Sequence, residues 1–454
     1  ADEAVALPGA GPAAYLNIEA VLAAARHTGA DAIHPGYGFL AERADFAAQC
    51  AQAGIRFVGP TPEQLAQFGD KAIAIALAKA CQVPVMPSTT GAATLAEIEA
   101  FFDAQTQGAS GSGIVIKAVG GGGGRGMRVV RERAELAAAY ARCQSEAKSA
   151  FGLDAVYAER LVVRARHIEV QIVGDGQQVI ALGERECTLQ RRFQKLVEMA
   201  PSPRLDAELR EQIVGAARRM AAQVGYQSLG TFEFLVEENE AGQQVGFVFI
   251  EANPRLQVEH TVTEQVTGVD LVETQLKLAQ GRTLAELGLN PAQPPAAKGF
   301  AIQLRVNGES IDAQGQAKPS HGALMPFDAP AGPGVRVDTH GYTGYAPSPL
   351  YDTLLAKLIV TSPTADFGEA VRRLKGALAE FRIGGVETNL PLLRALVDLP
   401  DFATQNVHTR YLETALPALV ERAQAIAAQD AQSTLAPVTA AGAPAKAAVS
   451  TESL

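Results

Sequence analysis

Residues 116–130 read Ile-Lys-Ala-Val-Gly-Gly-Gly-Gly-Gly-Arg-Gly-Met-Arg-Val-Val, a glycine run between two β-rich segments. The apolar stretches at 114–116 and 127–130 predict two strands, so the loop at 119–126 is predicted to be a hairpin tip. Glycine lets backbone N–H groups approach a phosphate chain closely because it has no Cβ. A Rossmann or Walker loop would instead lead from a strand into a helix. The stretch therefore predicts a hairpin lid over phosphates, with a flexible linker as the alternative.

Helical and β-rich segments alternate at the start of the chain. Apolar residues spaced three and four apart predict short helices at 17–29 and 41–53. The pieces at 32–33 and 55–58 are β-rich and are followed by Pro or Gly. This alternation predicts a parallel α/β layer that is too short to be a whole doubly wound domain. We expect its opening strands and glycine loop to precede residue 1.

The rest of the chain predicts two further domains and a tail. The predicted elements are helices at 71–81, 132–147 and 366–380, an alternating strand at 167–173, and a hairpin of strands at 231–236 and 246–251. The sequence NPAQPP at 290–295 marks a boundary, and the stretch from about 423 is Ala-rich with scattered Pro, Thr and Ser, which is typical of a linker. The fold class is therefore a multidomain combination of α/β and α+β parts. The predicted limits are 1–70, 71–290 with a lid at about 86–161, 291–415, and a linker at 416–454.

Composition excludes several classes of protein. The chain has 454 residues and a formal net charge of −10, which argues against a dedicated nucleic-acid or membrane-surface binder. No apolar run approaches the length of a transmembrane helix. The four cysteines are far apart and form no CxxC pair, which predicts neither a disulfide framework nor a zinc site. We expect a cytoplasmic protein without a secretory signal, or a mitochondrial one if the source is eukaryotic.

Two glutamates on neighbouring predicted strands form a candidate metal site. Glu233 lies in the strand Thr-Phe-Glu-Phe, and Glu251 ends the strand Phe-Val-Phe-Ile-Glu. Antiparallel pairing would bring the carboxylates together, and a hard cation such as Mg²⁺, or Mn²⁺, would relieve their repulsion. Asn253 adds a carbonyl oxygen two residues later. The alternative is two unrelated strand glutamates that face water. The polar residues at 253–260 directly after the strand also indicate a site, with an ordinary solvated loop as the alternative.

Several segments together resemble the biotin carboxylase component of biotin-dependent carboxylases, within the ATP-grasp superfamily. They occur in the family's order and extend to about residue 415. The segments are HPGYGFLAE (34–42), GDK (69–71), IKAVGGGGGRGMRVV (116–130), RHIEVQI (166–172), ERECTLQRRFQK (184–195), GTFEF (230–234), IEANPRLQVEHTVTE (250–264) and SPLYDTLLAKL (348–358). The resemblance implies an ATP-grasp domain with a glycine-rich lid, followed by a biotin carboxylase C-terminal domain.

The resemblance also implies a role for each matching residue. ATP would be bound by Lys71 and Lys117 at its phosphates, by Gly122, Gly123 and Gly124 of the lid, by Glu159 near the adenine, and by His167 and Gln190. The metal ions would be held by Glu233, Glu251 and Asn253. Bicarbonate would be surrounded by Lys195, Arg255, Gln257 and the Val258 backbone, with Glu259 as its general base. Arg336 in Gly-Val-Arg-Val would face the ureido oxygen of biotin.

The implied reaction is ATP- and bicarbonate-dependent carboxylation of biotin on a carrier domain, through carboxyphosphate. The implied partners are a biotin carboxyl carrier domain, a carboxyltransferase domain or subunit that selects acyl-CoA, pyruvate or urea as acceptor, and further copies of the chain in a homo-oligomer. The sequence departs from the family at Phe193, where the family has His near the ribose, and in lacking the usual N-terminal strand. These departures leave a catalytically weak nucleotide-binding module as an alternative. An ATP-grasp ligase for another product, such as carbamoyl phosphate, is a third reading.

Overall fold

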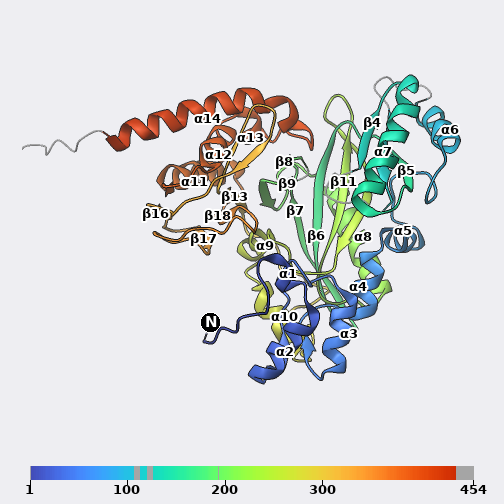
Figure 1. Ribbon diagram of the computed structural model, residues 1–454, viewed down its shortest axis with the longest axis horizontal. Coiled ribbons are helices and arrows are strands. Elements are labelled where there is room, and N and C mark those ends of the chain that lie inside the picture. Colours follow the sequence, from blue (N-terminus) through green and yellow to red (C-terminus); the bar gives the residue numbers. More distant parts are fainter. Residues whose placement is uncertain (1, 107–112, 120–125, 193, 436–454) are drawn as a thin grey trace, which may run out of the picture.

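The computed structural model describes residues 2–106, 113–119, 126–192 and 194–435. Figure 1 shows a long antiparallel sheet at the centre, a small lid on one side, an N-terminal layer below and a C-terminal region on the other side. The expected combination of α/β and α+β parts is confirmed. The predicted lid glycines Gly122, Gly123 and Gly124 lie outside the described residues, as does Phe193.

The N-terminal layer contains the predicted alternation of helices and parallel strands. Its elements are α1 (Pro12–Tyr15), α2 (Ile18–Thr28), β1 (Ala32–Ile33), α3 (Ala44–Gln52), β2 (Arg56–Phe57) and α4 (Pro62–Gly69), and β1 pairs with β2 in parallel. The side chain of Asn17 caps α2, and Gly29 ends it with a positive φ of 67°. The layer packs around Leu22, Phe46 and Cys50.

The lid is a separate three-stranded sheet backed by two helices. It comprises α6 (Leu95–Thr106), β3 (Ile114–Ala118), β4 (Met127–Val130), the 3₁₀ turn η1 (Arg133–Glu135), α7 (Leu136–Phe151) and β5 (Val156–Arg160). The strand order is β4-β3-β5, and β3 pairs antiparallel with β4. The predicted hairpin on either side of the glycine run is confirmed. The lid has its own core, which includes Ile98, Ile116 and Cys143.

The central sheet has the strand order β12-β11-β6-β7-β10-β13-β18-β17. Its strands are β6 (Ala165–Asp175), β7 (Val179–Glu186), β10 (Val197–Ala200), β11 (Gln227–Glu238), β12 (Gln244–Asn253), β13 (Phe300–Asn307), β17 (Val335–Thr339) and β18 (Leu354–Ser362). On one face of β6, Ile168, Val170 and Ile172 pack in the core formed with α8 (Ala207–Gln223) and α5 (Lys71–Ala80). The opposite face carries His167, Glu169 and Gln171, so the alternation of this strand directs its polar side chains to one side.

The smaller elements complete the sheet's surroundings. A ribbon of β8 (Gln190–Arg191) and β9 (Gln194–Lys195) projects between β7 and β10, and α9 (His260–Thr267) and α10 (Leu271–Ala279) follow β12. The C-terminal region adds β14 (Glu309–Ile311), β15 (Ala317–Pro319), β16 (Phe327–Asp328), α11 (Phe367–Glu380), β19 (Arg382–Ile383), α12 (Leu390–Val397), α13 (Pro400–Thr404) and α14 (Tyr411–Leu435). None of the helices in this described part of the chain combines the length and apolar character that a membrane span requires.

Two features of the C-terminal region differ from the expectation. Its strands β13, β18 and β17 continue the central sheet through pairing of β10 with β13, so no gap in hydrogen bonding separates this region from the preceding one. The linker expected from residue 416 is wrong for 416–435, which belong to α14. Leu416, Leu419 and Val420 are buried in the C-terminal core, and Ile426 packs against it. Burial of this apolar face holds the segment as a helix.

Candidate active site

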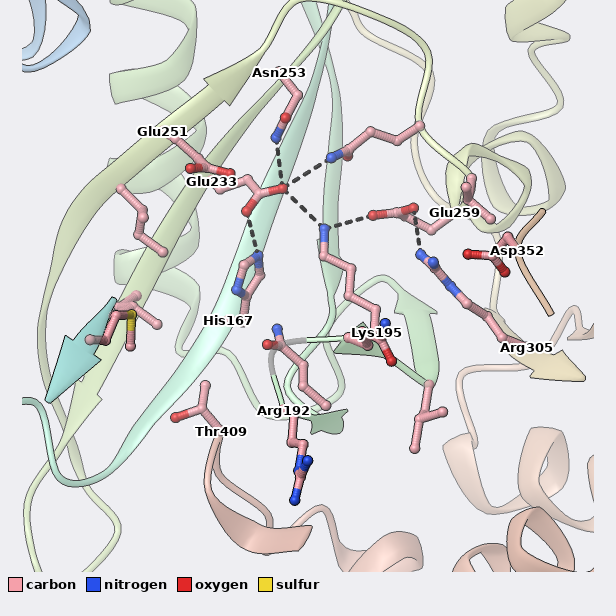
Figure 2. Close-up of a pocket in the computed structure, with 18 of the residues that line it drawn as sticks. His167, Arg192, Lys195, Glu233, Glu251, Asn253, Glu259, Arg305, Asp352 and Thr409 are labelled. Carbon is pink, nitrogen blue, oxygen red and sulfur yellow. Dashed lines mark hydrogen bonds and ion pairs between the residues drawn. The ribbon is translucent and has the colours of Figure 1, made fainter. Parts of the chain in front are cut away.

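A cavity of about 1080 Å³ lies where the lid, the central sheet and the C-terminal region meet. It collects almost all of the predicted site residues from elements that are far apart in the sequence. The predicted residues that line it are Lys71, Lys117, Glu159, His167, Gln190, Lys195, Glu233, Glu251, Asn253, Arg255, Gln257, Val258 and Glu259. Figure 2 shows the side chains from the sheet and the β8–β9 ribbon converging on one polar centre.

Two lysines stand at the lid side of the cavity. Lys117 on β3 forms an ion pair with Glu159 on β5, which is a diagonal neighbour across the lid sheet. Lys71 is the first residue of α5, which Asp70 caps through the backbone N–H groups of Ala72 and Ile73. The Lys71 ammonium lies 3.1 Å from Glu251 Oε2 and is more than half exposed. Both lysines can therefore exchange a carboxylate partner for an anionic ligand such as a phosphate.

The predicted carboxylate pair is directly opposite in the β11–β12 ladder. Glu233 and Glu251 are Cα partners, so their side chains leave the same face of the sheet, as predicted. Glu233 is buried and accepts a hydrogen bond from Asn253 Nδ2 at 2.9 Å, whereas Glu251 remains one-third exposed beside Lys71. The two carboxylates fit the preference of Mg²⁺ for oxygen ligands, while the Asn253 oxygen accepts from Arg255 Nη2 at 3.3 Å. The residues present therefore fit a magnesium ion at this end of the cavity.

Lys195 is the hub of the polar centre. Its ammonium lies 2.6 Å from Glu169, 3.0 Å from Glu233 and 2.7 Å from Glu259, and the β8–β9 ribbon carries it there (Figure 2). Burial alone would lower the pKa of Lys195, but the three carboxylates raise it well above its usual value. Burial alone would raise the pKa of Glu233, but Lys195 and His167 hold it well below its usual value. Lys195 and Glu233 are therefore both charged, and the charge of each stabilises the charge of the other.

Glu259 is a buried carboxylate between two cations. It follows β12 in the loop of residues 254–259, and its two oxygens meet Lys195 at 2.7 Å and Arg305 at 3.0 Å. Burial would raise its pKa, but Lys195, Arg305 and the nearby Arg185 outweigh burial and lower it. A carboxylate in this position is ionised and can accept a proton from a ligand held by the same cations.

The remaining predicted residues of this loop lie beside Glu259. Gln257 donates to Glu233 Oε1 at 3.0 Å. Arg255 extends toward the N-terminal layer, where its Nε lies 2.5 Å from Glu42 Oε1. The Val258 side of the loop lines the cavity. The structure therefore brings the predicted anion-binding residues together at one wall.

The role predicted for Arg336 at biotin stays a prediction. Arg336 does not line the cavity; its guanidinium binds Asp338 at 2.7 and 3.0 Å and Glu264 at 2.8 Å. A second arginine, Arg305 on β13, lines the cavity and bridges Glu259 and the fully buried Glu198. The strand order explains the different positions of the two arginines: β13 is adjacent to β10 in the sheet interior, whereas β17 is the edge strand.

Three charged residues that contact the predicted site residues were missed by the sequence analysis. Arg185 on β7 is fully buried and binds Glu169 at 2.5 Å, and its other nitrogens reach Gln171, Thr231, Gln257 and Thr263. Glu169 and Arg305 were also not assigned. A signal was present for both, because each lies among polar residues that alternate with apolar ones in a β-rich stretch.

Comparisons with known proteins identify the family of the chain. The family model of the biotin carboxylase N-terminal domain matches residues 1–65, that of the carbamoyl-phosphate synthase L chain ATP-binding domain matches 70–287, and that of the biotin carboxylase C-terminal domain matches 303–414. A biotin carboxylase of Pseudomonas aeruginosa is 43% identical over 418 residues, which are 92% of this chain and 89% of that protein. The chain belongs to the biotin carboxylase family.

Solved structures of biotin carboxylase domains share the whole fold. The biotin carboxylase domain of a single-chain bacterial carboxylase is 48% identical with a TM-score of 0.82, and the match covers 94% of this chain and 90% of that one. A dimer of the biotin carboxylase domain of 2-oxoglutarate carboxylase from Hydrogenobacter thermophilus, in complex with MgADP, ADP and bicarbonate, is 39% identical with a TM-score of 0.83 and coverage of 92% and 89%. The pyruvate carboxylase of Bacillus subtilis is 46% identical over 88% of this chain, which spans only about a third (34%) of that protein.

Proposed function

We propose that this chain carboxylates biotin held on a carrier domain, with ATP and bicarbonate, as the first half-reaction of a larger carboxylase. As a member of the biotin carboxylase family, the chain is an ATP-dependent ligase. The observation that carries the proposed roles is the position of Glu259 between Lys195 and Arg305, beside the pair Glu233 and Asn253. This arrangement combines a base, two cations and oxygen ligands for a metal in one cavity.

Glu259 acts as the general base for bicarbonate. Bicarbonate is a weak nucleophile, so a carboxylate that removes its proton assists attack on the γ-phosphate of ATP. Lys195 and Arg305 lower the pKa of Glu259 when no ligand shares their charge. An anion that binds at these cations takes up part of that charge and thereby raises the proton affinity of Glu259. Arg255, Gln257 and Val258 form the rest of the bicarbonate wall.

The nucleotide lies between the lid and the central sheet. Lys71 and Lys117 offset the phosphate charge, Glu159 meets the adenine, and His167 and Gln190 line the site. Glu233, Glu251 and Asn253 hold magnesium, which when bound offsets the charge that develops during phosphoryl transfer. The product of this step is carboxyphosphate, which hydrolyses easily, so the lid subdomain must exclude water.

Biotin receives the carboxyl group at the Arg305 side of the cavity. Carboxyphosphate breaks down to CO₂ and phosphate, and the phosphate takes the proton from biotin N1. The ureido oxygen then gains negative charge, and a fixed guanidinium stabilises it. Arg336 is the arginine predicted for this role, and Arg305, which contacts Glu259 at 3.0 Å, is a second candidate.

The partners follow from the relatives' architecture. The chain spans about a third of the pyruvate carboxylases it matches, and those relatives differ in acceptor from 2-oxoglutarate and long-chain acyl-CoA carboxylases. We propose a carrier domain, a carboxyltransferase component and a homo-oligomeric assembly, with domain limits at 1–70, 71–290 and 291–415. Mass spectrometry of the intact native polypeptide tests this, because the neighbouring domain identifies the acceptor.

Phosphate release with free biotin tests the activity itself. We expect ATP cleavage that requires bicarbonate and magnesium, and carboxybiotin formation when biotin is added. Binding of ADP without any bicarbonate-dependent turnover would instead support the nucleotide-binding module. Turnover that is indifferent to biotin but requires ammonia would support a carbamoyl-phosphate type of ligase, whose ATP-binding domain model matches residues 70–287.

A further inference from the structure

Two side chains, His260 and Lys357, bind backbone carbonyls of the loop of residues 254–259. Its backbone carbonyls must find partners because the loop is largely buried. His260 Nδ1 lies 2.6 Å from Gln257 O, and since a carbonyl only accepts, Nδ1 carries the proton. Burial, with Lys357 and other cations nearby, lowers the pKa of His260 to about 4, so the ring is neutral near pH 7. This contact fixes the peptide plane that joins Gln257 to Val258.

The next peptide plane has a different partner. Lys357 Nζ on β18 donates to Val258 O at 3.1 Å. That carbonyl belongs to the peptide that joins Val258 to Glu259, so its orientation sets the direction in which the Glu259 side chain leaves the backbone. The segment SPLYDTLLAKL, which contains Lys357, has no role in the chemistry described above. The contact therefore gives this segment a direct connection to the reacting centre.

The strand register explains why Lys357 reaches the loop. Lys357 is the Cα partner of Arg305 on β13 and also of Asp338 on β17, so the three side chains lie on one face of adjacent strands. Arg305 contacts the Glu259 carboxylate, and one strand further along Lys357 contacts the preceding residue's carbonyl. Neighbouring residues of two paired strands thus contact the Glu259 carboxylate and the peptide group that precedes Glu259.

The ammonium of Lys357 is itself fixed. Lys357 is only 8% exposed, and Asp338 Oδ2 lies 3.2 Å from it. Asp338 also receives both arms of Arg336, whose third contact is Glu264 on α9, the helix that begins immediately after Glu259. Burial of a lysine ammonium costs desolvation free energy unless the charge is paired, and Asp338 supplies that pairing here.

We propose that Lys357 is a positioning residue for the carboxylation reaction, which aligns Glu259 and the bicarbonate wall through the carbonyl of Val258. This inference rests on the proposed function. It predicts that Lys357 acts through the loop and not on the nucleotide, because its ammonium contacts Val258 and Asp338, whereas Lys117 and Glu159 pair with each other on the lid sheet. Removal of the ammonium should therefore disturb bicarbonate use selectively.

The test is the steady-state kinetics of Lys357→Met in the full chain. A hydrogen bond from a charged donor is worth roughly tenfold or more in an equilibrium constant. We expect the KM for bicarbonate to rise about tenfold or more, while the KM for ATP and the affinity for ADP change less than twofold. Lys277→Met is the matched control, because Lys277 is a half-exposed lysine on α10 that pairs only with Glu273 in the described structure.

A second variant separates positioning from stability. Lys357→Met leaves Asp338 without one of its cations, and the double variant Lys357→Met/Asp338→Asn removes that imbalance. If Lys357 positions the loop, the raised KM for bicarbonate persists in the double variant. It persists even where the thermal unfolding temperature of the double variant returns toward that of the wild type. Recovery of the bicarbonate KM in the double variant, or an equal rise in the KM values of ATP and bicarbonate, would overturn the proposal. Absence of bicarbonate-dependent ATP cleavage in the wild type would instead overturn the proposed function.

Discussion

Arg305→Gln tests whether Arg305, the second candidate beside Arg336, stabilises the ureido oxygen of biotin. Arg305 donates to Glu198 Oε1 at 2.5 Å and to Glu259 Oε2 at 3.0 Å. Glutamine keeps an amide donor but has no charge and is too short to reach both carboxylates. Loss of one donor to a developing oxyanion typically costs about 10²–10³ in rate, or roughly 3–4 kcal/mol. We expect carboxylation of free biotin to fall by this factor.

The same substitution should spare much of the earlier step. Bicarbonate-dependent ATP cleavage without biotin should fall less than about tenfold, because Lys195 still faces Glu259. Breaking a buried ion pair costs about 3–5 kcal/mol of stability. Thermal unfolding must therefore be recorded beside both assays. Arg372→Gln is the matched control, since its side chain is 69% exposed and pairs with Asp366 in the same region.

Two results would refute the assignment of Arg305. Equal loss of biotin carboxylation and of biotin-independent ATP cleavage would place Arg305 at the bicarbonate or phosphate step instead of at biotin. Retention of biotin carboxylation within tenfold in a folded variant would remove the guanidinium from the reaction altogether.

Three further predictions concern Glu251, Glu259 and Phe193. Glu251→Gln should abolish ATP cleavage at ordinary magnesium, because it removes one anionic ligand from a hard-cation site; most of the activity surviving would show that the metal assignment is wrong. Because the pKa of Glu259 is lowered in the folded protein, its contribution to stability is complete above the unfolded value of about 4.3 and is lost as the pH falls through the folded value. The urea midpoint should accordingly drop between about pH 5 and pH 3, and a Glu259→Gln variant with an unchanged slope in this range would contradict that account. Phe193→His should tighten ADP binding by up to roughly fivefold in calorimetric titration, the value of one neutral hydrogen bond; weaker binding would show that the pocket is adapted to Phe.

Local patterns were sufficient for the elements that carry most of the site. The glycine run between β-rich segments predicts a hairpin, and β3 and β4 pair as expected. The strands at 231–236 and 246–251 predict the opposition of Glu233 and Glu251, which the register of β11 and β12 contains. In each case the partners are close in sequence, so the turn between them fixes the register.

The end of the chain shows where composition misleads. The alanine content of the segment after 423 suggested a linker, yet the spacing of Leu412, Leu416, Leu419, Ala423 and Ile426 is that of one helical face. In the structure this face packs against the C-terminal core. Periodicity was therefore the better guide than composition, because burial of one stripe is enough to order an alanine-rich helix.

The different surroundings of Arg305 and Arg336 could not be predicted from local sequence. The two arginines lie in nearly identical contexts, Leu-Arg-Val and Val-Arg-Val, and both are in strands of the same sheet. What separates them is that β13 pairs with β10, which brings Arg305 next to Glu198 and Glu259, while β17 lies at the edge of the sheet. That pairing joins residues about 100 positions apart in the chain, such as Glu198 and Gln303, and no turn specifies it. The edge position also explains the contacts of Arg336: with no further strand beside β17 in the described sheet, its guanidinium pairs with Asp338 and Glu264 behind the loop that Lys357 holds.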